Sequence, residues 1–309
     1  MGKSLALVFH KEENSAMFEK ILIALKARYR LVSAAELEEL LFQKKELKNF
    51  CHISFDDGDR SFYNIIFPLL KKHKVPVSLF VSPQIIITGN NYWFQEIIGY
   101  DEDILKNILA EQLQISVDLI KKYSSQSIFK CLQVKQIYNV IEHYRQHTKE
   151  EKKTSQNMSA DQLMEVEASG WVTIGAHTMN HPVLKSENDK NAAFEIAESI
   201  KRLEILLGHP VKYFAYPNGR PGFDFDEREM NCLKNNKISL AFSAELDHVT
   251  ADTNPLSIPR MGFARMGLSP SNPLVSFRLN AGKKWIDVKS IGKPTEKEVR
   301  EKIKMILTA

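Results

Sequence analysis

Residues 54–62 read Ser-Phe-Asp-Asp-Gly-Asp-Arg-Ser-Phe and place two adjacent carboxylates at the end of a short apolar run. The run, residues 51–55, is typical of a buried strand, and Gly58 opens the loop that follows it. Where a strand ends the chain can turn, so Asp56 and Asp57 can both face one pocket. One carboxylate could then ligate a cation while the other takes a proton from water. The alternative is an Asp-Asp-Gly turn that only hydrogen-bonds its own backbone.

The composition is that of a soluble globular protein. The chain has 309 residues, of which 43% are hydrophobic and 26% charged, enough for one large α/β domain or two smaller ones. The net charge of +4 comes from basic residues scattered among acidic ones, so no nucleic-acid partner is expected. Cys51, Cys131 and Cys232 are odd in number and far apart, which favours a reducing compartment over a disulfide framework.

The N-terminal residues and the hydropathy predict where the protein resides. The apolar run 5–9 is too short for a signal peptide and is followed directly by charged residues. No stretch approaches the length of a transmembrane segment. We therefore expect the chain as given to be cytoplasmic, and exported only if a leader has been removed.

Short apolar runs alternate with helical patterns along most of the chain. Capping boxes at Ser33, Ser159 and Thr295 mark the starts of three helices. The expected strands are residues 5–9, 51–55, 76–81, 171–176, 213–216, 238–243 and 256–261. Seven strands separated mostly by helices predict an α/β fold with a parallel sheet. With this many units, a closed or nearly closed (β/α)7-type distorted barrel is favoured over an open sheet.

The alternation stops between residues 84 and 157. This stretch has helical patterns around residues 104–120 and 128–144, and nothing in it resembles an independent β-containing fold. We interpret it as a helical insertion within a single domain that covers residues 1–309. Tyr92, Trp93 and Phe94 could stack on a sugar ring, although aromatic residues in an insertion more often form its own small core.

Reactive side chains stand where the predicted strands end. Because the C-terminal ends of barrel strands meet at one face, these side chains would lie together. They are His10, Asp56 with Asp57, His177 with His181, Tyr216 with Pro217, and Arg260. The H-x-x-x-H spacing of His177 and His181 can place two imidazoles on one side of a helical turn. With one carboxylate they would form a three-ligand site with open positions for water, as expected of a catalytic metal.

Three of these motifs together resemble the polysaccharide deacetylase family, the NodB-homology carbohydrate esterases (carbohydrate esterase family 4-like). Residues 54–58, Ser-Phe-Asp-Asp-Gly, look like its T/S-F-D-D-G motif, and residues 177–182, His-Thr-Met-Asn-His-Pro, look like its H-S/T-x-x-x-H/P motif. Residues 214–219, Phe-Ala-Tyr-Pro-Asn-Gly, resemble the third motif as seen in the permuted exopolysaccharide deacetylase branch. The resemblance runs from His10 to about Arg260 and leaves out the insertion.

The resemblance implies a role for each matched residue. Asp57, His177 and His181 would hold a divalent metal, usually zinc, with cobalt, nickel or manganese as alternatives. Asp56 would be the general base, and the oxyanion would lie between the metal and a backbone N–H near Tyr216. Such a metal lowers the pKa of its bound water towards ~7 and polarises the acetyl carbonyl.

The leaving amine also needs a proton donor. Most of the family has a histidine for this in a Leu-x-His context near the end of the domain, and Leu246-Asp247-His248 is only a loose match. The permuted branch carries the histidine on its first strand, where Phe9-His10-Lys11 matches it. We therefore prefer His10 over His248 as the general acid. The alternatives are that His10 caps a strand end and that His248 is a solvated loop residue.

The last part of the resemblance concerns substrate positioning. Arg260 resembles an arginine that orients the catalytic base, with a surface ion pair as the alternative. The Asp-x-x-Asp-Trp fourth motif of the family is absent, and Asn218 replaces a frequent tyrosine. These departures affect how a substrate is positioned more than the chemistry.

The predicted function is metal-dependent removal of N-acetyl groups from an amino sugar in a polysaccharide, oligosaccharide or glycoconjugate. The expected partner is thus an N-acetylated carbohydrate. The eroded later motifs motivate one alternative, a catalytically silent carbohydrate-binding relative. The apparent lack of an export signal motivates another, a deacetylase of a small lipid- or nucleotide-linked amino sugar.

Overall fold

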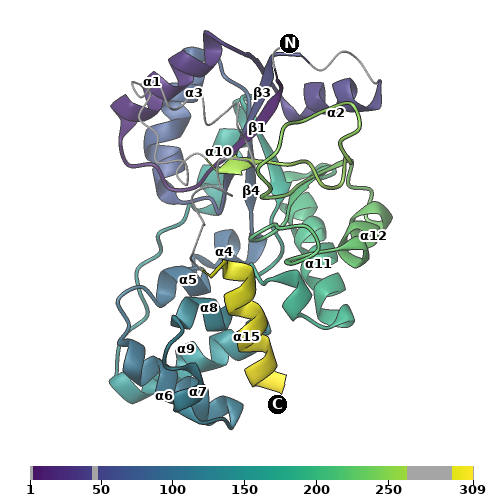
Figure 1. The fold of residues 1–309 in the computed structure, drawn as a ribbon. Helices are drawn as coiled ribbons and strands as arrows, with labels where there is room; N and C mark the ends of the chain where they lie inside the picture. The colour runs from purple at the N-terminus through teal and green to yellow at the C-terminus, as the bar shows by residue number, and fades with distance from the viewer. Residues whose placement is uncertain (1–2, 44–47, 263–293, 309) are drawn as a thin grey trace.

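A parallel β-sheet forms the centre of the protein in the computed structural model, which describes residues 3–43, 48–262 and 294–308 (Figure 1). The strands are β1 Leu5–Phe9, β2 Arg30–Val32, β3 Phe50–Asp56, β4 Val77–Val81, β5 Val172–Ala176, β6 Tyr213–Ala215, β7 Leu240–Phe242 and β8 Met261–Gly262. Their order is β7-β6-β5-β4-β3-β1-β8, and β2 pairs with β3 beside this path. The prediction of a parallel α/β architecture is confirmed.

Strand β3 is buried along its whole length, as a central strand of a parallel sheet covered on both faces should be. One edge of β3 pairs with β1. The other edge pairs with β2 over its first residues and with β4 over its last ones, where Asp56 lies opposite Phe80. Asp56 is therefore the last residue of a central strand, and Asp57 begins the loop at the C-terminal edge of the sheet.

Residues 255–262 join the two ends of the sheet. Ile258 forms a parallel bridge to Phe242 at the end of β7. A few residues later β8 pairs with β1, with Met261 opposite Leu7. The sheet therefore curls into the predicted distorted barrel, and Arg260 lies between the two attachments that close it.

Helices surround the barrel. They are α1 Ser15–Lys26, α2 Ala34–Phe42, the π-helical turn η1 Phe62–Ile66, α3 Phe67–His73, α10 Ala160–Ala168, the 3₁₀ turn η2 Leu184–Ser186, α11 Asp189–Leu207 and α12 Glu227–Asn235. The helical segment after the Asp-Asp-Gly motif changes from π-helical η1 to α3 near Pro68, which occupies the first turn of α3, where its missing N–H costs least. Aromatic rings pack between α1 and the sheet. The ring centroid of Phe9 lies 5.5 Å from that of Phe18, in an edge-on contact, and 5.3 Å from that of Phe55, in a stacked one.

Two strands differ from the prediction. Strand β2 was not predicted, because it has only three residues and Val32 is the only one of them that is fully buried. The strand expected at residues 256–261 is instead an isolated bridge at Ile258 followed by the two-residue β8. Both segments are extended because they pair with neighbouring strands, and neither has an apolar pattern strong enough to predict it from sequence.

The inserted stretch is helical wherever it is regular. Its helices are α4 Pro83–Thr88, α5 Trp93–Glu96, α6 Glu102–Leu113, α7 Val117–Ile120, α8 Ser125–Phe129 and α9 Val134–Thr148. With α15 Glu296–Thr308 most of them form a lobe at one end of the molecule (Figure 1). The lobe buries a hydrophobic cluster separate from the barrel core, and α15 contributes Ile303 to it. The limits of the single domain and its insertion remain a prediction.

Helix α15 is fixed to both the lobe and the barrel by ionic contacts. Arg300 and Asp224 form a fully buried ion pair of 2.6 Å. Glu296 accepts hydrogen bonds from Lys130 in the lobe and from Arg220 beside the barrel, each at 2.7 Å. None of the helices in the described ranges has the length and hydropathy of a membrane span.

Candidate metal and catalytic site

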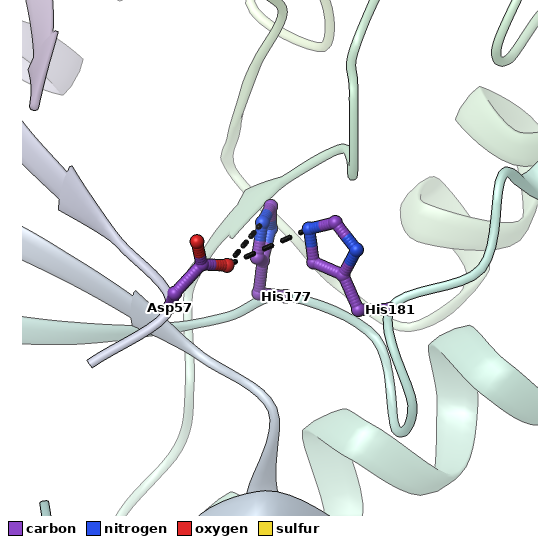
Figure 2. A group of neighbouring side chains, drawn as sticks. All are labelled: Asp57, His177 and His181. Carbon is purple, nitrogen blue, oxygen red and sulfur yellow. Dashed lines mark ion pairs between the residues drawn. The ribbon is translucent and has the colours of Figure 1, made fainter. Parts of the chain in front are cut away.

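Asp57, His177 and His181 converge at the C-terminal edge of the sheet (Figure 2). Oδ1 of Asp57 lies 3.7 Å from Nε2 of His177 and 3.5 Å from Nε2 of His181. All three residues are buried, and one ligand atom of each lies within 4.8 Å of the others. Ligands that bind one ion tetrahedrally at about 2.1 Å lie about 3.4 Å apart. The spacing therefore suits a single ion.

The carboxylate of Asp57 supplies a second sign that the group fits a metal. Its Oδ1 is buried and accepts no hydrogen bond from the residues that the structure describes. Burial raises the pKa of Asp57, and the charges of Asp56 and Asp59 raise it further. A buried carboxylate without a donor is costly, and a divalent cation between the three ligands would offset that cost. The two imidazoles and one carboxylate are ligands suited to zinc.

The two histidines are in the protonation state that ligation requires. Nδ1 of His177 lies 2.7 Å from the carbonyl oxygen of Ala215. In the neutral ring this nitrogen donates, so Nε2 keeps its lone pair on the side of Asp57. Burial lowers the pKa of His177 to about 4, and burial together with the charge of His177 lowers that of His181. Both rings are therefore neutral near pH 7.

The loop that carries the histidines is irregular, so the expected helical turn is wrong. Thr178 and His181 have positive φ angles of 63° and 59°. Glu195 on α11 replaces the hydrogen bonds that a helix would have made. Its carbonyl accepts the N–H of Met179, and its carboxylate accepts the N–H and the side-chain amide of Asn180. The two imidazoles still meet, because this buried support folds the loop back on itself.

Gly58 has a steric reason to follow the two carboxylates. Asp57 and Gly58 both have a φ of 73°, in the left-handed region that only glycine adopts at little cost. A Cβ atom at Gly58 would lie 2.9 Å from a methyl carbon of Val81. The Asp-Asp-Gly sequence therefore serves a close approach of β3 to β4 as well as the turn.

Asp56 is held by a bidentate pair with Arg260. The two guanidinium nitrogens donate to its two oxygens at 2.7 and 2.8 Å, and Arg260 also donates to Ser54 and to the carbonyl of Ser243. Burial, the largest single influence, would raise the pKa of Asp56, but the charge and hydrogen bonds of Arg260 together with the charges of His177 and His10 outweigh it and lower the pKa to about 2. Arg260 is 1% exposed, so the alternative of a surface ion pair is wrong.

His10 and His248 lie near opposite ends of β1. His10 directly follows β1 at the C-terminal edge of the sheet, is exposed, and acts electrostatically on Asp56 and His177. Val249, next to His248, bridges to Ser4 just before β1 begins. Five strand residues span about 16 Å. This separation favours His10 over His248 as the candidate acid.

The side chain of Tyr216 is not directed at the three ligands. Its hydroxyl donates to the carbonyl of Leu256 at 2.9 Å, and its ring stacks on Phe225 with 3.5 Å between centroids. The backbone N–H of Tyr216 donates to Phe242 at 3.1 Å. An oxyanion donor in this region would therefore have to be a neighbouring amide, and the role of Tyr216 stays a prediction.

The aromatic residues at the start of the insertion contact the backbone of two of the candidate ligand residues. Of the two alternatives for these residues, the small core is supported, because Trp93 is buried in the hydrophobic cluster of the lobe and Phe94 packs against that cluster. In addition, Tyr92 hydrogen-bonds the backbone of Asp57, Trp93 that of His181, and the ring of Phe94 lies 5.0 Å from the ring of His181. No spacing along the sequence could have indicated these contacts.

The parallel barrel thus brings three buried candidate metal ligands, a carboxylate held by arginine and a histidine to the same strand ends, an arrangement suited to hydrolysis. The profile of the polysaccharide deacetylase family matches residues 43–238. The chain belongs to this family, whose members are carbohydrate deacetylases. The match contains Asp56 and the three proposed metal ligands, whereas His10 and Arg260 lie outside it.

Several solved structures share the fold at low sequence identity. The Streptococcus pyogenes deacetylase PplD, solved in complex with acetate, is 18% identical with a TM-score of 0.58, and the alignment covers 88% of this chain and 97% of that one. IcaB from Ammonifex degensii is 18% identical with a TM-score of 0.56, with 98% of both chains covered. A de-N-acetylase from Aggregatibacter actinomycetemcomitans is 16% identical with a TM-score of 0.57, with 89% and 98% covered. No curated protein sequence matches the chain.

Proposed function

We propose that this protein is a metal-dependent hydrolase that removes N-acetyl groups from an amino sugar in a polysaccharide, oligosaccharide or glycoconjugate. The main support is the convergence of Asp57, His177 and His181 beside the carboxylate of Asp56, which Arg260 holds in place. Family membership supports the carbohydrate substrate. The three solved structures support the fold on which the site is built.

The proposed cofactor is a divalent metal held by Asp57, His177 and His181. Zinc suits two imidazoles and one carboxylate best, and cobalt, nickel or manganese could substitute for it. When bound, such an ion lowers the pKa of a water molecule towards ~7 and polarises a carbonyl group.

Asp56 is the proposed general base. The pKa of Asp56 is about 2, largely because of Arg260, so the carboxylate of Asp56 is ionised throughout the neutral range. The same bidentate pair fixes the plane of the carboxylate, so a proton can be accepted without first reorienting the side chain. A base of such low pKa is weak, and it therefore depends on a water that is already acidified.

His10 is the proposed general acid, and its replacement is a direct test. We expect His10→Ala to lower kcat for acetate release by about 10²–10⁴-fold, because the departing amine loses its proton donor. His248→Ala is the matched control, since it removes the other candidate histidine at the far end of β1. Metal content and steady-state kinetics are measured for both. A normal kcat in His10→Ala, or an equal loss in His248→Ala, would contradict this assignment.

The metal-dependent reaction is tested by acetate release from N-acetylglucosamine oligomers and from small acetamido-sugar conjugates. We expect a chelator to abolish release and added zinc or cobalt to restore it, because the proposed reaction needs a metal to acidify the water and polarise the acetyl carbonyl. Release from the small conjugates alone would favour a lipid- or nucleotide-linked substrate. Sugar binding without acetate release, with metal bound, would contradict the proposal and favour a silent binding protein.

A further inference from the structure

The backbone carbonyls of all three proposed metal ligands accept hydrogen bonds from buried side chains. The hydroxyl of Tyr92 donates to the carbonyl of Asp57 at 2.8 Å. The hydroxyl of Ser82 donates to the carbonyl of His177 at 2.9 Å, and the indole N–H of Trp93 donates to the carbonyl of His181 at 3.1 Å. The three donors belong to one short segment, residues 82–93, which leads from the end of β4 into the helical insertion.

Two of the ligands need such support because of their backbone conformation. Asp57 and His181 have φ angles of 73° and 59°, which residues other than glycine seldom adopt. A strained conformation of this kind persists where the surrounding structure holds it. Tyr92 and Trp93 anchor these two residues, so their hydrogen bonds act where the backbone is least stable on its own.

His181 depends on the insertion for its ring orientation as well. The ring of His177 is oriented by the hydrogen bond of its Nδ1 to Ala215. Nδ1 of His181 is buried and has no hydrogen-bond partner among residues 3–43, 48–262 and 294–308. Its ring is instead packed edge-on against Tyr92 and Phe94, with centroids 5.5 and 5.0 Å away. The ring of His181 is therefore oriented by aromatic packing from the insertion, whereas the ring of His177 is oriented by a hydrogen bond.

The insertion is also tied to the Asp57 loop where it returns to the barrel. The N–H of Met158 donates to the carbonyl of Gly58, and the N–H of Arg60 donates to the carbonyl of Gln156, each at 2.9 Å. The side chains of Gln95 and Asn157 hydrogen-bond each other and so join the two ends of the insertion. The loop that carries Asp57 is thus held from both ends of the inserted segment.

We propose that Ser82, Tyr92 and Trp93 are positioning residues that set the geometry of the metal ligands, which makes the helical insertion a structural part of the metal centre. This inference rests on the proposed metal-dependent function. It also implies that metal binding and the order of residues 91–96 are coupled in both directions, since each favours the same backbone arrangement of Asp57 and His181.

Tyr92→Phe is the most informative variant, because it removes one hydroxyl and keeps the ring. The zinc affinity of the full chain is measured by competition with a chromophoric chelator, and we expect the variant to bind zinc about 10–100-fold more weakly than the wild type. Ser82→Ala and Trp93→Phe should weaken zinc binding in the same direction.

Tyr144→Phe is the matched control. Tyr144 is a fully buried tyrosine in the same insertion, and its hydroxyl accepts the N–H of Asp101 at 2.8 Å without contacting a ligand residue. The metal-free forms of the two variants should therefore lose similar thermal stability, while Tyr144→Phe keeps the wild-type zinc affinity. Hydrogen exchange of residues 91–96 should slow on zinc binding in the wild type, and less so in Tyr92→Phe.

The outcomes separate this inference from the function on which it rests. If the wild type binds no zinc, cobalt, nickel or manganese, the proposed metal-dependent function fails. If the wild type binds zinc and Tyr92→Phe binds it equally well, the positioning role is overturned while the function stands. An equal loss of affinity in Tyr144→Phe would also overturn it, because the effect would then be a general loosening of the insertion.

Discussion

Asp56→Asn is expected to lower kcat for acetate release by about 10²–10⁴-fold while zinc still binds. The amide cannot accept a proton from water at neutral pH, and the three ligands Asp57, His177 and His181 remain in place. The change also leaves the buried charge of Arg260 only partly compensated, so stability should fall as well. Kinetics, zinc content and thermal unfolding are therefore measured on the same preparation, well below its unfolding temperature.

Asp224→Asn provides the control for the loss of a buried ion pair. Asp224 pairs with Arg300 of α15, and both residues are buried. We expect a comparable drop in unfolding temperature with kcat close to that of the wild type. If Asp56→Asn kept its kcat, or if Asp224→Asn lost as much, Asp56 would not be the general base.

Arg260→Met is expected to destabilise the protein by about 3–5 kcal/mol, because it leaves Asp56 as a buried carboxylate without its partner. The pH dependence of stability should also reverse for this carboxyl group. In the wild type its pKa is lowered from 3.8 to about 2, so its contribution of about 2 kcal/mol is present above pH 3.8 and is lost as the pH falls towards 2.

In Arg260→Met, burial would instead raise the pKa of Asp56 above its value in the unfolded chain. A carboxyl group with a raised pKa stabilises the fold below the unfolded pKa, and that contribution is lost as the pH rises through the folded pKa. The variant should therefore be least impaired in acid, and the acid limb of its kcat/KM profile should move to higher pH. Urea unfolding and kinetics between pH 3 and pH 8 would show both effects.

Arg300→Met is the control for Arg260→Met, since it removes a second fully buried arginine that pairs with an aspartate. It should cost a similar free energy of unfolding without moving the acid limb of kcat/KM. If the two variants had the same activity profile, Arg260 would only stabilise the fold and would not set the ionisation of the base.

The parts of the fold that the sequence could predict are those with a strong local pattern. Strand β3 is a continuous buried run, so its end and the two carboxylates that follow could be located from the residues alone. The loop after β5 lacks such a signal. Its histidines were expected on a helical turn, but the turn is replaced by contacts with Glu195, a residue on a later helix.

Long-range contacts were beyond local patterns. Arg260 and Asp56 are separated by 204 residues. The predicted barrel placed both at one face, and only the family resemblance suggested that the arginine orients the base. Tyr92 and Trp93 donate hydrogen bonds to the backbone carbonyls of Asp57 and His181. Every residue has a backbone carbonyl, so the residue type of the acceptor does not indicate such a bond. The support of the proposed ligands could therefore be found only in three dimensions.

Helix α15 affects when the lobe can finish folding during synthesis of the chain, because α15 follows the rest of the lobe in the sequence. The ribosome releases the insertion early, yet the hydrophobic cluster of the lobe includes Ile303, and Asp224 has its charged partner in Arg300. A nascent chain that ends before residue 296 would hold the barrel strands together with an unfinished lobe. Because that lobe begins with Tyr92 and Trp93, the proposed metal ligands would gain their full support only after α15 has emerged. The completion of the site would thus wait until residues beyond the last barrel strand, β8, have been synthesised.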